Sequence, residues 1–200
     1  GQTGYWLALT GARIKAADCM ALGLATHHVE STRLEALKAD LIAASGPDRI
    51  ASTLSAHASD PGPSPLAPYR TVLDDCFDAP TVEAVMDRLE RDASDWAKAQ
   101  HAALRTKSPQ TLKVALRQLQ TGAAFADFAS NMVMEYRIGA RVVQRHDFLE
   151  GVRAVIIDKD NDPKWSPATL ESVDKAMLDE IFAPLAADQE WTPLTIRNRA

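Results

Sequence analysis

The stretch HDFLEGVRAVIIDKDNDPKW, residues 146–165, contains a helix start, a short apolar helix and an abrupt polar exit. Asp147 is placed to accept hydrogen bonds from the free N–H groups of a first helical turn, and Glu150 to bond back to the cap, as in a capping box. Pro163 cannot continue a helix, because it lacks the N–H group. The apolar stripe between these signals consists of Val152, Val155 and Ile156. The stretch therefore predicts a capped, one-sided helix followed by a charged loop.

Similar helix signals recur along the whole chain. Ser108-Pro109 is a cap followed by proline in a first turn, and Gly23 suits the left-handed position after a helix. A long apolar stripe predicts one helix, or two nearly collinear helices, over residues 81–107. Another stripe predicted to be buried consists of Phe125, Phe128, Met132, Tyr136, Gly139 and Val143. We predict a mainly α chain of roughly eight or nine helices, with at most one short strand at Leu24–Val29.

The composition sets limits on partners and compartment. The 200 residues are 46% hydrophobic, which is enough for one substantial core or two small ones. A formal net charge of −5 argues against non-specific binding of nucleic acid. No apolar run of about 18 residues predicts a membrane span, and the first residues do not resemble a secretory signal. With Cys19 and Cys76 forming no disulfide framework, we expect a reducing, cytoplasmic location.

The residues that could carry catalysis are scattered. His27 and His28 are adjacent, and on an extended segment their side chains would point in opposite directions, so they are poorly placed to share a metal ion. Cys76 has no base near it in sequence and is expected to be a buried thiol. Ser108 is expected to be a helix cap. We therefore predict no catalytic and no metal-binding residue in this chain.

Two segments resemble the crotonase (enoyl-CoA hydratase/isomerase) superfamily. LTGARIKAADCMALGLATHHV, residues 9–29, is similar to a segment that follows the catalytic core of that superfamily, and residues 146–165 are similar to its C-terminal helix. In more detail, GYWLALTG, SPQTLKVALRQLQTG and MEYRIGARVVQRHDFLEGVRAVIIDKDNDPKWSPATL look like the 3-hydroxyisobutyryl-CoA hydrolase family. The resemblance covers about residues 4–182. It implies that residues 1–30 are the end of a crotonase-like core region and residues 31–200 a C-terminal helical region.

The resemblance also implies an activity. It implies a thioester hydrolase that acts on 3-hydroxyisobutyryl-CoA in valine catabolism, with CoA as part of the substrate and no other cofactor. The oxyanion hole and acidic residues of that family lie upstream of its GY-x-LALTG segment, so this chain would be a C-terminal half without catalytic residues. The implied partners are the missing N-terminal catalytic half, an acyl-CoA and, as an option, further copies of the chain. Two alternatives stay open: the C-terminal part of an enoyl-CoA hydratase/isomerase, and a non-catalytic helical module for packing and assembly.

The end of the resembling region supplies the candidate binding residues. In crotonase relatives, the C-terminal helix and the segment after it lie near the adenine and phosphate end of CoA. This likeness makes Lys159, Lys164 and Trp165 the candidate CoA-binding residues, with the lysines offering charge to phosphate and Trp165 a surface for stacking. The alternative is that the lysines are solvated and Trp165 only anchors the tail.

Overall fold

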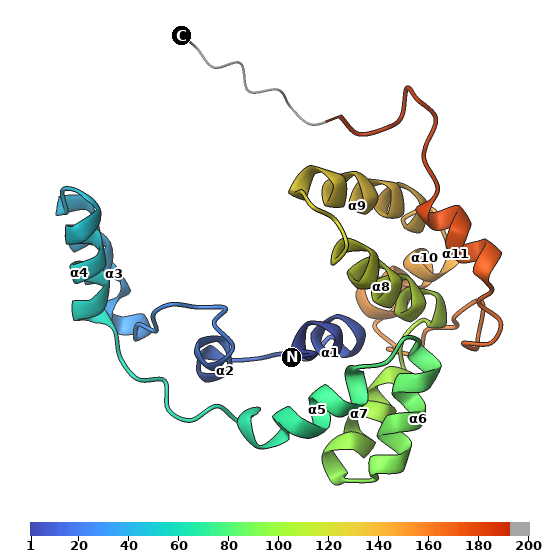
Figure 1. The fold of residues 1–200 in the computed structure, drawn as a ribbon, viewed down its shortest axis with the longest axis horizontal. Helices are drawn as coiled ribbons and strands as arrows, with labels where there is room; N and C mark the ends of the chain where they lie inside the picture. Colours follow the sequence, from blue (N-terminus) through green and yellow to red (C-terminus); the bar gives the residue numbers. More distant parts are fainter. Residues whose placement is uncertain (193–200) are drawn as a thin grey trace. The chain divides into compact units, whose positions relative to one another are not determined.

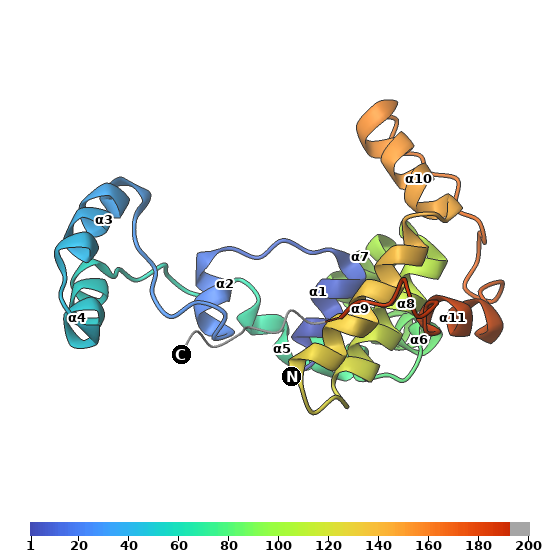
Figure 2. The ribbon, with the colours of Figure 1, turned by 90° about the horizontal axis from the view of Figure 1, so that it is seen from above.

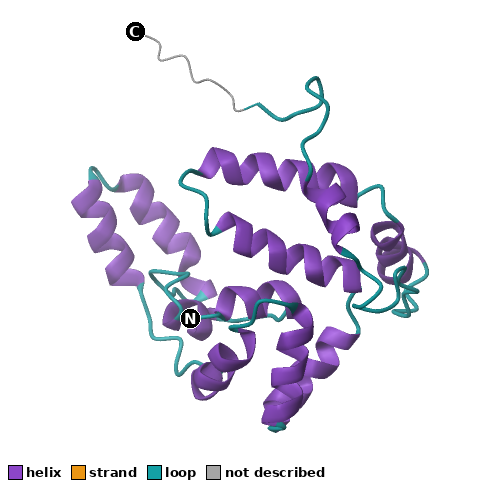
Figure 3. Ribbon diagram, turned by 45° about the vertical axis from the view of Figure 1, so that its right-hand side comes forward, coloured by secondary structure: helices purple, strands orange, loops and turns teal. Residues whose placement is uncertain are grey.

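The computed structural model describes residues 1–192, and within them every regular element is a helix (Figure 3). The mainly α fold is confirmed, with eleven α-helices among residues 1–192 in place of the eight or nine predicted. The one strand candidate, Leu24–Val29, does not form a strand, which agrees with the prediction of at most one. A β-ladder needs repeated backbone pairing, whereas in the described part of the chain this segment has one long-range backbone bond, from Ser59 N–H to the His28 carbonyl.

The chain divides into two compact units, one of Ala12–Thr71 and one of Gly1–Gly11 with the residues from Val72 onward. The predicted division at residue 30 stays a prediction. The helices of the smaller unit are α2 (Ala16–Ala21), η1 (Ser31–Arg33), α3 (Leu34–Ala43), α4 (Pro47–His57) and η2 (Ala67–Tyr69), and α5 (Arg70–Phe77) begins at its end. The other helices are α1 (Thr3–Thr10), α6 (Val82–Asp92), α7 (Asp95–Arg105), α8 (Pro109–Gly122), α9 (Phe128–Val142), α10 (His146–Val152), the π-helix η3 (Arg153–Ile157) and α11 (Lys175–Phe182).

A buried carboxylate orders the proline-rich loop of the smaller unit. Asp18 on α2 accepts hydrogen bonds from Ser64 Oγ at 2.6 Å and from the N–H of Leu66 at 3.0 Å. Burial alone would raise the pKa of Asp18, but these hydrogen bonds outweigh it and hold that pKa below its usual value. In the same unit, His57 Nε2 lies 2.8 Å from Asp40 Oδ2 and joins α4 to α3.

In the larger unit, α6 and α7 pack against each other as a hairpin (Figure 1). Ala93 has a φ of 55°, and Ser94 caps α7 by accepting a hydrogen bond from Ala97 N–H at 3.2 Å. The left-handed residue reverses the chain, so the prediction of one helix or two collinear ones over residues 81–107 is wrong. The fully buried residues of α5, α6 and α7 are Leu73, Phe77, Val82, Val85, Leu89, Ala97 and Leu104.

A second cluster joins α8, α9 and α11, and Figure 1 draws α8 and α9 side by side. Its buried members are Val114, Met134, Ile138 and Ile181. Ser108 caps α8 as predicted, because its Oγ accepts a hydrogen bond from Thr111 N–H at 3.0 Å. Arg141 on α9 donates to the carbonyls of Ile181, Ala183 and Pro184, which satisfies carbonyls at the end of α11 that have no helical partner.

The apolar stripe predicted to be buried on α9 is not buried in the described chain. Phe128 is 76% exposed and Tyr136 is 44% exposed, whereas Met134 and Ile138 are buried. Residues two positions apart lie about 200° apart around a helix, so Tyr136 and Ile138 are on opposite sides. α9 therefore has two apolar stripes, and only the second packs against α8 and α11.

The helix predicted from the opening stretch exists, but with a different start and apolar side. α10 and η3 project from the other helices of their unit (Figure 2) and mainly contact each other. The stripe predicted to pack is exposed, at 60% for Val155 and 64% for Ile156. The helical part ends at Ile157, before Pro163. No helix within residues 1–192 combines the length and apolar character needed to cross a membrane.

Candidate functional site

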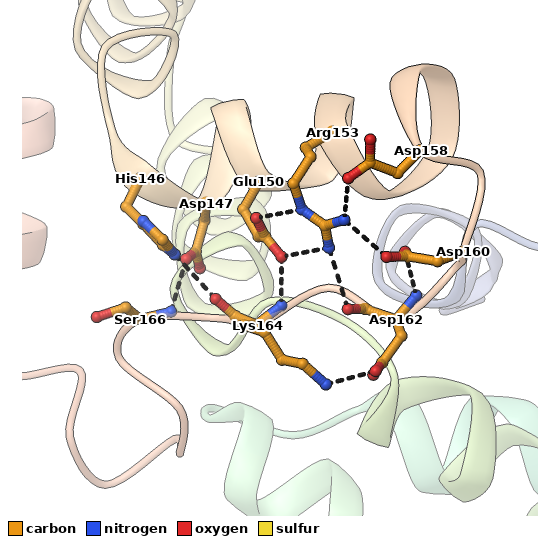
Figure 4. Close-up of polar contacts among 9 residues, drawn as sticks. All are labelled: His146, Asp147, Glu150, Arg153, Asp158, Asp160, Asp162, Lys164 and Ser166. Atoms are coloured by element: carbon orange, nitrogen blue, oxygen red, sulfur yellow. Dashed lines mark hydrogen bonds and ion pairs between the residues drawn. The ribbon is translucent and has the colours of Figure 1, made fainter.

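Arg153 is the centre of a polar network that folds residues 158–164 back onto α10 (Figure 4). Its guanidinium makes a two-bond contact with Glu150, at 2.9 and 2.8 Å. It also donates to the carboxylates of Asp158 and Asp160, both at 2.6 Å, and to the carbonyl of Asp162 at 3.2 Å. Five donors on a planar group allow one arginine to satisfy several acceptors at once. The loop is therefore held in place by one side chain.

The network lowers the pKa values of its acids. Hydrogen bonds from Arg153 and from the N–H of Lys164 hold the pKa of Glu150 at about 2. Those from Arg153 and from Asp162 N–H also hold the pKa of Asp160 below its usual range. The same bonds raise the pKa of Arg153 above its usual value. A general acid or base at neutral pH needs a pKa near 7, so Glu150 and Asp160 are suited to holding the loop and not to proton transfer.

Asp147 is a buried connector and not the predicted cap. Arg145 is the N-cap of α10 and makes no side-chain cap bond. The Asp147 side chain, 4% exposed, instead accepts hydrogen bonds from Ser108 Oγ and, at 2.8 Å, from Ser166 N–H. The capping-box prediction is wrong for Glu150 too, since its carboxylate is engaged by Arg153 and Lys164. Asp147 therefore ties the start of α8 to the tail.

Trp165 lines a cavity of about 420 Å³ in the larger unit. Its ring is held by a hydrogen bond from Nε1 to the Thr106 carbonyl at 3.0 Å, and it lies against Gly151, where an added Cβ would be 3.6 Å from Cη2. The cavity is lined from four segments, by Met86, Leu104, Arg105, Lys107, Pro109, Leu112, Trp165, Ala168, Thr169, Leu170 and Glu171. Its volume is within the usual range for small-molecule sites.

The structure separates the three candidate CoA-binding residues. Lys159, at φ 56°, and Lys164 do not line the cavity that contains Trp165. The ammonium group of Lys164 is paired with Asp162 at 2.5 Å. The cavity is lined instead by two other cations, Arg105 and Lys107. No sequence pattern pointed to them, because only the tertiary structure brings the end of α7 next to the tail.

The remaining candidates form no catalytic group. Cys76 is buried, as predicted, and burial followed by the nearby charges of Asp92 and Asp75 raises its thiol pKa. His27 and His28 are each half-buried, and His28 Nδ1 lies 3.1 Å from Ser59 Oγ. In the described range, no group of three or more His, Cys, Asp or Glu side chains is arranged to hold a metal ion.

The fold and these residues can be compared with known proteins. A family model described as enoyl-CoA hydratase/isomerase matches residues 1–182, and the chain belongs to this family. Within it, the chain is similar to the mitochondrial 3-hydroxyisobutyryl-CoA hydrolases of Xenopus laevis and Homo sapiens, each 39% identical over 94% of this chain. A probable 3-hydroxyisobutyryl-CoA hydrolase of Arabidopsis thaliana is 35% identical. The chain spans about half the length of these relatives, 50% for the first two.

Two solved structures are also similar. A carnitinyl-CoA dehydratase from Mycobacterium thermoresistibile has a TM-score of 0.84 and 32% identity, with 94% of this chain and 53% of that chain covered. An enoyl-CoA hydratase from Rhodobacter sphaeroides has a TM-score of 0.80 and 33% identity, with 96% and 54% covered. The expected resemblance to the crotonase superfamily is thus confirmed. The expectation that the chain is part of a longer enzyme of this family fits the coverage, because the chain spans only about half the length of its curated relatives.

Proposed function

We propose that this chain is the helical part of an enzyme that hydrolyses the thioester of 3-hydroxyisobutyryl-CoA. The observation that carries this proposal is the 39% identity over 94% of the chain to proteins named for that activity. The final motif supports the choice within the family, because DKDNDPKW, residues 158–165, is the ending that resembles the hydrolases. Hydrolysis would release the free acid and CoA. CoA would enter as part of the substrate, and no other cofactor would be needed.

We place the catalytic residues in the half of the relatives' length that this chain does not span. The described residues support this placement, because hydrogen bonds hold the pKa values of Glu150 and Asp160 below their usual range, which suits them to holding the loop and not to proton transfer. The isolated chain is then inactive, and its role is to complete the enzyme.

The exposed apolar sides of α9, α10 and η3 support an interface with the remainder of the protein. Ile157 is 68% exposed and Leu149 60% exposed, in addition to Phe128 and Ile156. Exposed apolar clusters of this kind mark interaction surfaces in soluble proteins. The other half of the same protein is the proposed partner, with a second copy of the chain as the option that sedimentation would reveal.

The second candidate activity is the hydration of an enoyl-CoA. It is favoured by the two similar solved structures, which are those of a carnitinyl-CoA dehydratase and an enoyl-CoA hydratase. Lys159, Lys164 and Trp165 stay proposed CoA-binding residues under either activity. The cytoplasmic location also stays a prediction, while the vertebrate relatives are named as mitochondrial.

One assay separates the two activities. The complete protein is incubated with 3-hydroxyisobutyryl-CoA, and separately with an α,β-unsaturated acyl-CoA, while free thiol and loss of the double bond are followed. Release of thiol from the first substrate without hydration of the second supports the hydrolase. Hydration without thiol release contradicts it and favours the second candidate.

A further inference from the structure

A second cavity of the larger unit, about 290 Å³ in volume, is lined by the start of α6, by α8 and by the chain from residue 173 into α11. It shares no lining residue with the cavity beside Trp165. Its apolar side chains are Pro80, Val82, Leu116, Val173 and Leu178. Three of them, Val82, Leu116 and Val173, are each at most 3% exposed. An alkyl group that enters this cavity would therefore be removed from water, which is favourable.

Two cations on the same cavity share a single carboxylate. Arg117 Nη1 lies 2.8 Å from one oxygen of Asp179, and Lys175 Nζ lies 2.5 Å from the other. Neither cation pairs with a second acid among residues 1–192. The Arg117 guanidinium also lies over the Phe182 ring, 4.5 Å from its centroid, so its position is fixed from two sides. This side of the cavity therefore has one positive charge more than its acid neutralises.

Charge and size limit the ligand that fits. The other cation and acid of the lining, Lys113 and Glu83, are paired with each other at 2.6 Å. One excess positive charge matches a monoanion, and a planar guanidinium offers paired N–H groups that suit a carboxylate. The volume is at the lower end of the range of about 300–1,000 Å³ that is usual for small-molecule sites. The cavity therefore suits an acid of a few carbon atoms and not a whole acyl-CoA.

We propose that this cavity binds a short-chain aliphatic carboxylate, with the carboxylate at Arg117 and Lys175 and the alkyl group against Val82, Leu116 and Val173. The inference goes beyond the proposed function and does not depend on it, because the charge, the apolar walls and the volume of the cavity define the ligand. Under the proposed function, the released acid belongs to this class. The enzyme would then carry a site for its product outside the catalytic half.

NMR titration of the methyl-labelled chain with isobutyrate tests the inference. The methyl signals of the cavity should shift as the acid binds, namely those of Val82, Leu116, Val173 and Leu178. Three matched compounds should bind at least about tenfold more weakly, as expected when a charged hydrogen bond or an alkyl group is lost. Isobutyramide keeps the shape without the charge, whereas acetate and inorganic phosphate keep a charge without the branched alkyl group.

Variants of the two cations test the charged side of the cavity. Arg117→Gln with Lys175→Gln should weaken isobutyrate binding by at least about tenfold. Because Arg117 also contacts Phe182, Lys175→Gln alone is the variant that is safe for folding, since this side chain is 86% exposed. It should weaken binding by about two- to fivefold. The matched control, Lys98→Gln, removes a 65% exposed lysine that does not line the cavity and should leave affinity unchanged.

Each other result counts against the inference. It is overturned if isobutyrate leaves the cavity methyl signals unshifted, or if Lys175→Gln binds as tightly as the parent. Equal binding of isobutyramide rejects the role of the cations, and equal binding of phosphate rejects that of the apolar walls. Thiol release from the complete protein judges the proposed function separately, so either conclusion can fail while the other holds.

Discussion

Replacement of Asp147 by alanine should destabilise the chain more than the loss of any charge in the loop. The substitution removes the acceptor of two hydrogen bonds. Ser108 is 5% exposed, so its O–H would be left without an acceptor, although its oxygen still accepts from Thr111 N–H, at a cost of about 1–3 kcal/mol. Ser166 is exposed and its N–H can turn to water, which costs about 0.5–1 kcal/mol. The free energy of unfolding should therefore fall by about 1.5–4 kcal/mol.

Urea unfolding followed by far-UV circular dichroism measures this change. Asp147→Asn is the graded variant: its oxygen can still accept from Ser166 and its amide can donate to Ser108, so about 1 kcal/mol is expected. Lys159→Ala is the exposed control and should change stability by less than about 0.5 kcal/mol. An Asp147→Ala midpoint equal to that of the parent would refute the argument, as would equal losses for the alanine and the asparagine variants.

Three further outcomes are expected. The pKa of Glu150 lies at about 2 in the folded chain against an ordinary 4.5, so its contribution to stability is present above about pH 4.5 and is lost as the pH falls toward 2. Arg153→Gln should therefore reduce the dependence of the free energy of unfolding on pH in this window. An unchanged dependence would contradict the role of Arg153. Asp18→Ala should release the loop of residues 59–68, seen as faster limited proteolysis there, whereas unchanged cleavage would show that the prolines alone order it. Phe128→Ser and Ile156→Ser should each lower the binding of a hydrophobic dye, with no change in helix content, and equal dye binding would place the exposed apolar surface elsewhere.

Local signals predicted the helical fold well. The cap at Ser108, the glycine at position 23 and the 3.6-residue stripes act within a few residues, so they are readable without the tertiary structure. The sequence could not decide whether Leu24–Val29 forms a strand, because strand pairing depends on a distant partner. The α6–α7 turn was missed because Ala93 takes a left-handed conformation that its sequence does not announce. The motif resemblance gave the family, because the motifs of residues 9–29 and 146–165 can be recognised without the tertiary structure.

The site was less predictable, because its contacts join distant segments. Asp147 looked like a cap, since an acid at a helix start commonly is one, but its partners, Ser108 and Ser166, lie 39 and 19 residues away. The motif drew attention to Trp165, which lines the cavity, and its role in binding stays a prediction. Arg105 and Lys107 carry no pattern of their own, and only their position on the cavity makes them candidates.

Thiol release from 3-hydroxyisobutyryl-CoA, measured for the chain alone and for the complete protein at equal concentration, tests the central claim most directly. The account predicts turnover by the complete protein at the common enzyme scale of about 1 per second or more, and none above background by the chain alone. Turnover by the isolated chain would contradict the placement of the catalytic residues outside it. A complete protein that binds the thioester and releases no thiol would contradict the proposed hydrolase.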